Sequence, residues 1–494
     1  MNSPADLYFL TRSRLNELAG QCDCSDCDCA CAPQMESGSL LSPPFAQHTR
    51  LYPLADIQIH ALDAGNHMVV GGKSSLAVLS SGCLALLKSF PATTGEVLRQ
   101  MAPRWGKEKV EQVIRGLLGH GLLVDDPLAA RLAPDPPAHG LSAWIHLAGS
   151  CNLACHYCYV PNSAEKLSPA TGRGIIDSIF RSAQAHHFSA VKLKYAGGEP
   201  LLNFPTLIEN YRYARALGAE MGIAVEGKIL TNGVLLNTAV LDRIAEHDLS
   251  LTISLDGTRA FHDANRPLRA GGGSFEKVEK GLKLALAHGL KPGISITISG
   301  ASAPGLPALV EYLLDLDLRF TFNFYRENDL SKERQELNFD NRRLIDTLLE
   351  TYRVIEARKP DFAFWNALGD RVNLQQAHSR PCSVGKNYLV FDVHGNLSRC
   401  QVEMETSLGD YTASDPLELI RAASGGLENI PVEHKPDCQG CTWNAWCAGG
   451  CPALARQISG SYSARSPYCD IYREIIPALL RLEAKSLLRA ASYA

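Results

Sequence analysis

Short apolar runs alternate with amphipathic stretches between residue 143 and about residue 330. The runs are Trp144–Leu147, Val191–Tyr195, Lys228–Thr231, Leu251–Leu255, Ile294–Ile298 and Phe320–Phe324. Between them, apolar residues recur at the spacing of a helix that buries one face. Repeated β-then-α order predicts a parallel sheet whose strands are joined by helical crossovers. We therefore expect an α/β domain over residues 141–335.

A second pattern precedes this domain. Residues 50–132 begin with two β-like runs, Ile57–Ala61 and His67–Val70. Helical periodicity follows in residues 80–90, 95–102 and 108–123. The stretch 133–140, APDPPAHG, has the composition of a linker. The sequence predicts an N-terminal unit of two or three short strands followed by three helices.

The remaining segments are simpler. Residues 1–48 contain one short apolar-periodic piece, the run QCDCSDCDCACAP and a Ser/Pro-rich stretch, which together predict a flexible arm. Residues 336–379 are expected to form a connecting helical segment. Residues 380–494 contain a second block of cysteines and end in an amphipathic helix, so we expect a separate C-terminal domain there.

Composition narrows the class of protein. The 494 residues suffice for about three domains, and 46% hydrophobic residues suffice for real cores. The formal net charge of -4 indicates neither a nucleic-acid nor a membrane partner. There is no secretory signal and no run of about 18 apolar residues, so a cytoplasmic location is expected. Sixteen cysteines in that compartment favour metal or cluster ligation over disulfides.

Three cysteines follow the first apolar run of the α/β domain at an unusual spacing. Cys151, Cys155 and Cys158 form a CxxxCxxC triplet in the sequence GSCNLACHYCYV. Three thiolates at these spacings can hold three corners of a 4Fe-4S cube, which is usually held by four, so that one iron stays open. The alternatives are plain buried cysteines or a zinc site, although zinc normally draws on paired CxxC or Cys/His sets.

Glycine and polar residues end the following strands. The second strand ends in YAGGEP, where Gly197 and Gly198 allow a ligand close to the backbone and Glu199 can receive an ammonium group. Further polar residues end the third and fourth strands: Asn232, Ser254 and Asp256. Such residues also form turns. Because the carboxyl ends of barrel strands meet on one side, we expect these residues near the triplet.

The second block consists of seven cysteines with regular spacing: Cys382, Cys400, Cys438, Cys441, Cys447, Cys451 and Cys469. Together with the triplet and GGEP, this spacing resembles the radical S-adenosylmethionine (SAM) enzymes, and among them the SPASM-containing branch. The resemblance covers residues 50–470. It implies a partial (β/α)6 barrel, bound SAM and three 4Fe-4S clusters, one at the triplet and two auxiliary. SAM on the open iron would yield a 5′-deoxyadenosyl radical.

Carried over by position, the resemblance divides the second block between the two auxiliary clusters. The complete, distal set would be Cys438, Cys441, Cys447 and Cys469. The set nearer the barrel would be Cys382, Cys400 and Cys451. No cysteine occurs in NLQQAHSRP before Cys382, so we expect an open iron that accepts His378, a small ligand or a substrate thiolate. The alternative is that Cys83 or an N-terminal cysteine closes the site.

The resemblance also implies roles around SAM. Glu199 would hold the amino group, and Tyr157 would lie near adenine. The ribose and carboxylate would be contacted by Asn232, Ser254, Asp256 and an arginine, either Arg266 or Arg269. Candidates for catalytic side chains are Glu403, Tyr325 and Arg326. Sulfatase maturases of this branch carry an aspartate directly after the second cysteine of the block, where this chain has Gln401.

The N-terminal unit resembles the peptide-recognition domain of ribosomal peptide modification systems, a small winged helix-turn-helix that also occurs as the chaperone of the pyrroloquinoline quinone pathway. Such a domain adds a leader peptide to the edge of its sheet. Between Asn66 and Asp126 there are seven Lys/Arg and five Asp/Glu, and this small excess of positive charge is weak for a surface that binds DNA. The five cysteines of the arm are Cys22, Cys24, Cys27, Cys29 and Cys31. They allow a metal site, a redox relay, a fused substrate-like sequence or a reduced tail.

These features lead us to expect a radical SAM enzyme that installs a crosslink in a ribosomally synthesised precursor peptide, with a thioether favoured over a carbon-carbon bond. An electron donor such as flavodoxin or ferredoxin is expected as a partner. One alternative is a maturase of a protein or enzyme subunit, of the sulfatase-maturase or quinohemoprotein-maturase kind. The other is an iron-sulfur sensor that binds DNA through its winged helix, which predicts steeply salt-dependent DNA affinity.

Overall fold

A computed structural model of the chain describes residues 7–11, 48–71, 75–126, 138–360, 365–374 and 377–492. Its largest element is a nine-stranded sheet in the order β13-β12-β11-β10-β9-β8-β14-β15-β16. Six of these strands run parallel and in chain order: β8 (Gly140–His146), β9 (Ala190–Ala196), β10 (Ala224–Thr231), β11 (Ser250–Ser254), β12 (Gly293–Ile298) and β13 (Phe320–Phe324). The expected α/β fold with a parallel sheet is confirmed.

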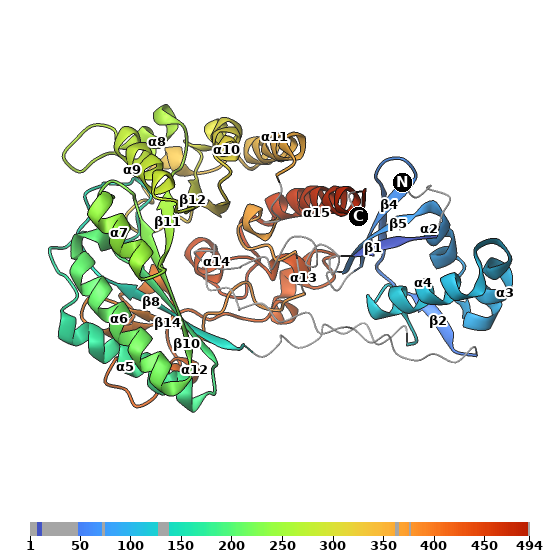
Figure 1. Cartoon of the computed structure of the whole chain (residues 1–494), viewed down its shortest axis with the longest axis horizontal. Helices are drawn as coiled ribbons and strands as arrows, with labels where there is room; N and C mark the ends of the chain where they lie inside the picture. The colour runs from blue at the N-terminus through green and yellow to red at the C-terminus, as the bar shows by residue number, and fades with distance from the viewer. Residues whose placement is uncertain are drawn as a thin grey trace.

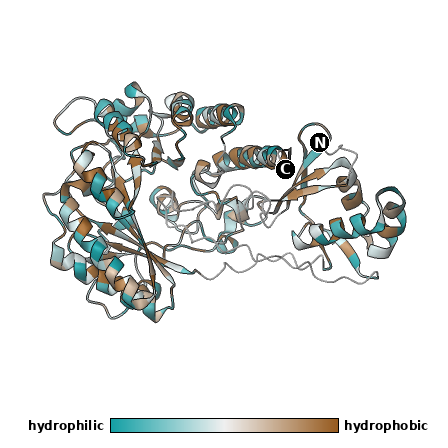
Figure 2. Ribbon diagram, viewed as in Figure 1, coloured by the Kyte–Doolittle hydropathy of each residue, from teal (hydrophilic) through white to brown (hydrophobic). Residues whose placement is uncertain are grey.

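Helices connect these strands and cover the outer face of the sheet. They include α5 (Pro169–Ala185), α6 (Phe204–Met221), α7 (Thr238–Glu246), α9 (Phe275–Ala287) and α10 (Leu306–Asp315). The helices α5, α6 and α7 lie on the side of the sheet that faces away from α13 (Asn444–Cys447), α14 (Pro452–Ser459) and the C-terminal helix (Figure 1). The strands are mainly hydrophobic while the helices carry hydrophilic residues outward (Figure 2), as expected for a sheet buried beneath helices.

The C-terminal segment does not form a wholly separate domain, contrary to the expected boundary at residue 380. Strand β14 (Tyr388–Phe391) pairs in parallel with β8, and it is followed by the antiparallel strands β15 (Asn396–Ser398) and β16 (Gly409–Asp410). The reason is that β14 is fully buried and apolar, so it needs a sheet neighbour to satisfy its backbone. The barrel sheet therefore continues into the segment that carries the second cysteine block.

The N-terminal unit contains a sheet in the order β1-β5-β4-β3 and three helices. The three central strands are β3 (Gln58–Ala61), β4 (Asn66–Gly71) and β5 (Ser75–Ser80). The helices are α2 (Ser81–Lys88), α3 (Thr94–Trp105) and α4 (Lys107–Gly119). A capping box between Thr93 and Glu96 fixes the start of α3. The chain also forms a small sheet from β2 (Arg50–Pro53), β6 (Ala92–Thr93) and β7 (Leu123–Val124).

Part of the expected flexible arm belongs to this sheet, which corrects the prediction for residues 1–48. Strand β1 (Phe9–Thr11) pairs antiparallel with β5. The physical reason is its pattern, because Leu7 and Leu10 are buried on opposite sides of the strand. The five cysteines at positions 22–31 lie outside the described residues.

The C-terminal helix α15 (Cys469–Ser492) brings the C-terminal segment into contact with the N-terminal unit. It packs on α11 (Asn341–Arg358) and also contacts β1 and β5 of the N-terminal unit. Arg481 donates a hydrogen bond from Nη1 to the carbonyl of Ala61 at 3.0 Å. Among the described residues, no helix combines the length and the apolar character needed to cross a membrane.

Candidate active site

The cysteine triplet forms a loop directly after β8. Backbone amides of Ala154 and His156 donate to the carbonyls of Pro267 and Asn265, at 2.9 Å each. Arg269 donates to the carbonyls of Cys151 and Leu153, at 2.9 and 3.1 Å. Arg269 therefore supports the loop from outside. Burial raises the pKa of all three thiols, and that of Cys155 to about 12, so these thiols ionise only with a cationic partner.

The end of β9 presses against the start of this loop. A Cβ on Gly198 would lie 2.3 Å from the carbonyl oxygen of Ser150, and one on Gly197 would lie 2.7 Å from that of Ala148. Only glycine fits at such an approach. The next residue, Glu199, is thereby fixed, fully buried, beside the cysteine loop.

The carboxylate of Glu199 accepts three hydrogen bonds from the protein. Thr231 donates from Oγ1 at 2.6 Å, and the amides of Asn232 and Leu201 donate at 2.9 and 3.1 Å. Burial raises the pKa of Glu199, against the lowering effect of these bonds. A carboxylate with four acceptor positions keeps one for a ligand cation.

Asn232 ties the end of β10 to the cysteine loop. Its Nδ2 donates to Asn152 Oδ1 at 2.7 Å and contacts Cys151 Sγ at 3.7 Å. Ser254, at the end of β11, is half-buried and lies opposite Ser295 of β12. The strand ends thus converge on the loop, as the sequence predicted.

Tyr157, Asp256 and Arg266 form a buried network across the site. Tyr157 donates to Asp256 Oδ2 at 2.5 Å, and Arg266 donates to the Tyr157 hydroxyl and lies 3.6 Å from Asp256. Burial raises the pKa of Asp256, which Arg266 partly offsets. Of the two candidate arginines, Arg266 faces inward. Its Nε and the Nδ2 of Asn152 are buried without a hydrogen-bond partner among the described residues, which fits donors awaiting a ligand carboxylate.

A histidine that the sequence analysis did not identify fixes this network. His262 is fully buried, accepts from the Asp256 amide through Nδ1 at 3.3 Å and contacts Ser274 Oγ through Nε2 at 2.9 Å. Ser274 in turn donates to the carbonyl of Arg266 at 2.5 Å. Burial lowers the pKa of His262 to about 3, so its ring is neutral. His262 lies in a helix with ordinary spacing, and nothing in the sequence marks it.

The second block of cysteines forms two groups in space. Cys438, Cys441, Cys447 and Cys469 line one cavity, together with Arg465 and Tyr472. Cys382, Cys400 and Cys451 form the other group. Burial raises the pKa of the Cys400 thiol, and the nearby charges of Cys451 and Cys382 raise it further. No three Cys, His, Asp or Glu side chains of the described ranges converge on a single ion. Ligands to different corners of a cube stand further apart than those of one ion.

Lys435 lies between the two cysteine groups, and no motif or spacing in the sequence marks it. Burial lowers its pKa, which the thiols of Cys438, Cys447, Cys451 and Cys382 oppose. The side chain is completely buried, and in the described part of the chain Nζ has no hydrogen-bond partner. Anionic cluster groups on both sides would provide the missing partners.

The three candidate catalytic side chains have different surroundings. Arg326 forms an ion pair with Asp370 at 2.7 Å. Burial raises the pKa of Cys451, but the charges of Arg326 and Arg371 together with hydrogen bonds outweigh it, so that the pKa of this thiol is lowered. The hydroxyl of Tyr325 lies 2.8 Å from Ser331 Oγ. Burial raises the pKa of Glu403.

Cys83 cannot close the nearer group. It lies in α2, completely buried in the apolar core of the N-terminal unit, and burial raises its pKa to about 12. The side chain of Cys83 packs inside a different hydrophobic core, which excludes this cysteine as the closing ligand. The N-terminal cysteines, the other part of that alternative, lie outside the described residues. Gln401, the residue after Cys400, accepts a hydrogen bond from the buried Tyr388 hydroxyl at 3.1 Å.

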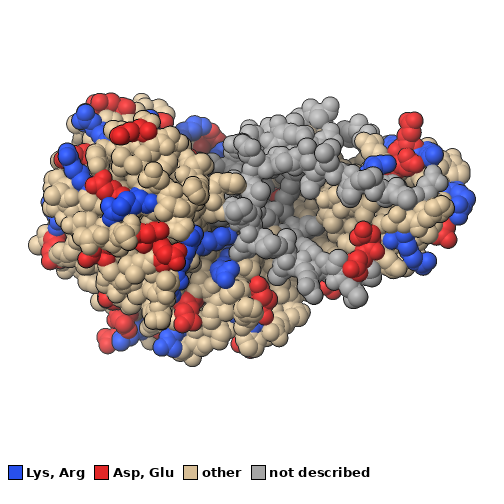
Figure 3. Space-filling view, turned by 90° about the horizontal axis from the view of Figure 1, so that it is seen from below, with Lys and Arg blue, Asp and Glu red and all other residues tan. Residues whose placement is uncertain are grey.

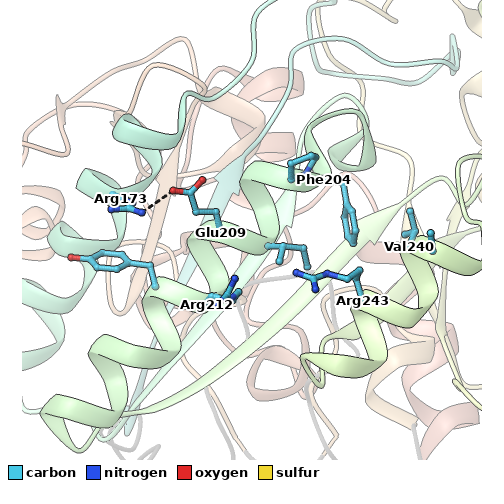
Figure 4. Close-up of a pocket in the computed structure, with 10 residues that line it drawn as sticks. Arg173, Phe204, Glu209, Arg212, Val240 and Arg243 are labelled. Atoms are coloured by element: carbon cyan, nitrogen blue, oxygen red, sulfur yellow. Dashed lines mark hydrogen bonds and ion pairs between the residues drawn. The ribbon is translucent and has the colours of Figure 1, made fainter.

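A separate hollow lies on the outer helical face. It measures about 860 Å³, between α5, α6 and α7 (Figure 4). Arg173 and Glu209 form an ion pair of 2.9 Å across it, and Arg212 and Arg243 line it. Basic and acidic side chains are interspersed on the surface seen in Figure 3. We assign the chemistry to the strand ends, where the glycines, the buried carboxylates and the cysteines meet.

Comparison with known proteins agrees with this geometry. Residues 145–301 match the model of the Radical SAM superfamily. The serine-type anaerobic sulfatase-maturating enzyme of Klebsiella aerogenes is 26% identical over 343 residues, covering 66% of this chain and 82% of that enzyme. The pre-heme d1 synthase of Dinoroseobacter shibae is 30% identical over 378 residues, covering 69% and 88%.

A solved structure shares the fold. Native anSMEcpe with bound AdoMet and the Cp18Cys peptide aligns with a TM-score of 0.60 and 18% identity, over 72% of this chain and all of that one. At this identity the likeness concerns the fold.

Proposed function

This chain is a member of the radical SAM superfamily, and within it we propose that it installs a crosslink in a ribosomally synthesised peptide, a thioether in preference to a carbon-carbon bond. Enzymes of the superfamily use SAM and a 4Fe-4S cluster, and relatives of this chain are maturases. The substrate class and the bond are the proposal.

The residues at the strand ends fit a cluster with SAM. Cys151, Cys155 and Cys158 would hold the cluster, which with SAM supplies a carbon radical able to remove hydrogen from an unactivated C-H bond. Glu199 keeps an acceptor for the SAM amino group, and Arg266 offers Nε to a carboxylate. A donor of the flavodoxin or ferredoxin kind would supply the electron.

The two cysteine groups of the C-terminal segment support two auxiliary clusters. The group of four around one cavity would fully ligate one cluster. The group of Cys382, Cys400 and Cys451 would leave one iron for a further ligand. A substrate thiolate in that position would be deprotonated and held beside the reacting carbon, which favours a thioether.

The observation that carries the choice of a crosslink is Gln401. At this position sulfatase maturases of the SPASM branch carry an aspartate that acts as a base, whereas an amide cannot accept a proton. Gln401 is instead held by Tyr388. A second candidate, maturation of a protein or enzyme subunit, is favoured by the sequence similarity to sulfatase-maturating enzymes and by Glu403, a half-buried carboxylate two residues further on.

The test is anaerobic incubation of the cluster-loaded enzyme with SAM, a low-potential reductant and either a leader-bearing precursor peptide or a folded enzyme subunit. We expect 5′-deoxyadenosine and a loss of about two mass units per crosslink in the peptide. Cys155→Ser should abolish both, and Cys83→Ala, in the separate core, should abolish neither. Modification of the subunit alone would favour the second candidate, and no SAM cleavage by the loaded enzyme would refute the proposal.

A further inference from the structure

Strand β1 forms the edge of the N-terminal sheet next to β5, although it lies far from β5 in the sequence. The central strands β3, β4 and β5 follow one another directly, whereas β1 reaches β5 from more than 60 positions earlier. Leu10 pairs with Val78, and the amide of Ser80 donates to the carbonyl of Tyr8 at 3.1 Å. This is the geometry of an extended peptide added to a sheet edge.

The strand lies in a slot with three sides. Helix α15 contacts both β1 and β5 on one side. On the other side, Leu7 belongs to the same core as Ile114 and Leu117 of α4, and Phe9 packs against that core. Leu10, which points the opposite way, joins the core that includes α15. Alternate side chains of β1 therefore fill pockets on opposite faces.

A notch in α4 receives the ring of Phe9. A Cβ on Gly116 would lie 1.9 Å from Cζ of that ring, so no other residue fits there while the ring is in place. The same ring meets His120 edge-on, with centroids 6.0 Å apart. A glycine inside a helix costs roughly 0.5–1 kcal/mol relative to alanine. The notch is thus a pocket shaped for an aromatic anchor.

We propose that the edge of β5 between α4 and α15 is a peptide-docking slot, and that residues 7–11 are a recognition segment supplied to it by the chain itself. The inference deepens the proposed function, because it names the pattern of the recognised peptide: an aliphatic residue, two aromatic residues and a second aliphatic residue, in extended form. A separate peptide of this pattern competes with the tethered one, whose effective concentration is on the order of millimolar.

The test uses the full chain and a labelled peptide of sequence PADLYFLTRSR, with fluorescence anisotropy as the readout. The double variant Phe9→Ala/Leu10→Ala empties both pockets of β1, and we expect it to bind the peptide at least tenfold more tightly than the wild type. The matched peptide, with alanine in place of its phenylalanine, should bind the double variant no more tightly than it binds the wild type.

A second variant tests the slot itself. Gly116→Ala fills the notch but improves the helix propensity of α4, so we expect a folded protein that rejects the peptide. Hydrogen exchange in β4 and α3 reports whether the unit stays folded. A folded double variant without gained affinity, or loss of the fold of the unit, would show that β1 is a fixed strand and overturn the proposal. Neither SAM nor reductant is used, so failure of the crosslinking reaction leaves this result unaffected.

Discussion

Lys435 lies against Gly449 between the two cysteine groups, so closely that a Cβ on Gly449 would stand 2.9 Å from the lysine Nζ. Gly449 also has a φ of 77°, a conformation that favours glycine. The backbone here makes room for a cation that in the described residues has no hydrogen-bond partner. A cation at this place would act on clusters held by either group of cysteines.

We expect Lys435→Met to lower the midpoint potentials of both auxiliary clusters by tens of millivolts. The reduced cluster carries the greater negative charge, so loss of a nearby cation or N-H donor destabilises it. Redox titration followed by electron paramagnetic resonance measures the change. Lys283→Met, on the exposed face of α9, is the control and should leave the potentials unchanged. Unaltered potentials in a fully iron-loaded Lys435→Met protein would contradict this role.

Glu199→Gln should weaken SAM binding by about tenfold to a hundredfold, since a hydrogen bond to a charged group contributes about 1.5–3 kcal/mol. The amide also loses an acceptor where the Asn232 amide donates. Calorimetric titration of the cluster-loaded protein with SAM measures this. Glu209→Gln, on the outer helical face, should bind as the wild type does; equal affinity of both variants would remove Glu199 from the site.

Glu403→Gln should separate the two halves of the reaction. Burial raises the pKa of Glu403 toward the range of a general base, and the amide lacks this function. We expect continued formation of 5′-deoxyadenosine, with a lower ratio of crosslinked peptide to 5′-deoxyadenosine than in the wild type. Glu405→Gln, exposed and two residues away, is the matched control. An unchanged ratio would exclude Glu403 as the base.

His262 should make stability depend on pH. Its folded pKa of about 3 lies below the ordinary value of 6.5, so the unfolded chain takes up the proton first. The stabilising effect is complete well above pH 6.5 and is lost as the pH falls toward 3, with a loss of about 1.0 kcal/mol between pH 6.5 and 5.5 and about 1.4 kcal/mol for each further pH unit. The difference in unfolding free energy between wild type and His262→Gln should narrow accordingly. A constant difference would mean that the ring titrates normally.

Strand β1 also bears on the five cysteines at positions 22–31, which follow it in the sequence and lie outside the described residues. If residues 7–11 are a recognition segment in cis, these cysteines are the substrate nearest to it along the chain. We expect the full chain, incubated with SAM and reductant, to lose about two mass units per crosslink, one hydrogen from a carbon and one from a thiol. The mass of the Phe9→Ala/Leu10→Ala variant should stay unchanged in the same incubation. Crosslinking of an added precursor peptide by this variant would show that the enzyme is still active.

Much of this architecture followed from local sequence. The six apolar runs became parallel strands. Strand β8 is buried along its whole length, whereas β12 alternates buried and half-buried residues, and both patterns mark a strand in the sequence. The strand ends converge because parallel strands place their carboxyl ends together. The glycines before Glu199 were readable as a close approach, and the structure gives the partners, the carbonyls of Ala148 and Ser150.

Other features could not be read from the chain. Lys435 and His262 act through partners far away in sequence, and no spacing rule marks a single buried residue. The pairing of β1 with β5 rests on three residues, too few for a periodic signal. The choice between Arg266 and Arg269 depended on which way each side chain turns after a short helix.

The pairing of β14 with β8 has a consequence for electron flow. The triplet follows β8 and Cys400 follows β15, and β14 pairs with both of these strands, so the two sites belong to one continuous sheet. Neighbouring strands keep a spacing of about 4.8 Å and cannot hinge without breaking their hydrogen bonds. Tunnelling rates fall steeply with distance, so carriers mounted this way would exchange electrons at a constant rate while a substrate enters and leaves.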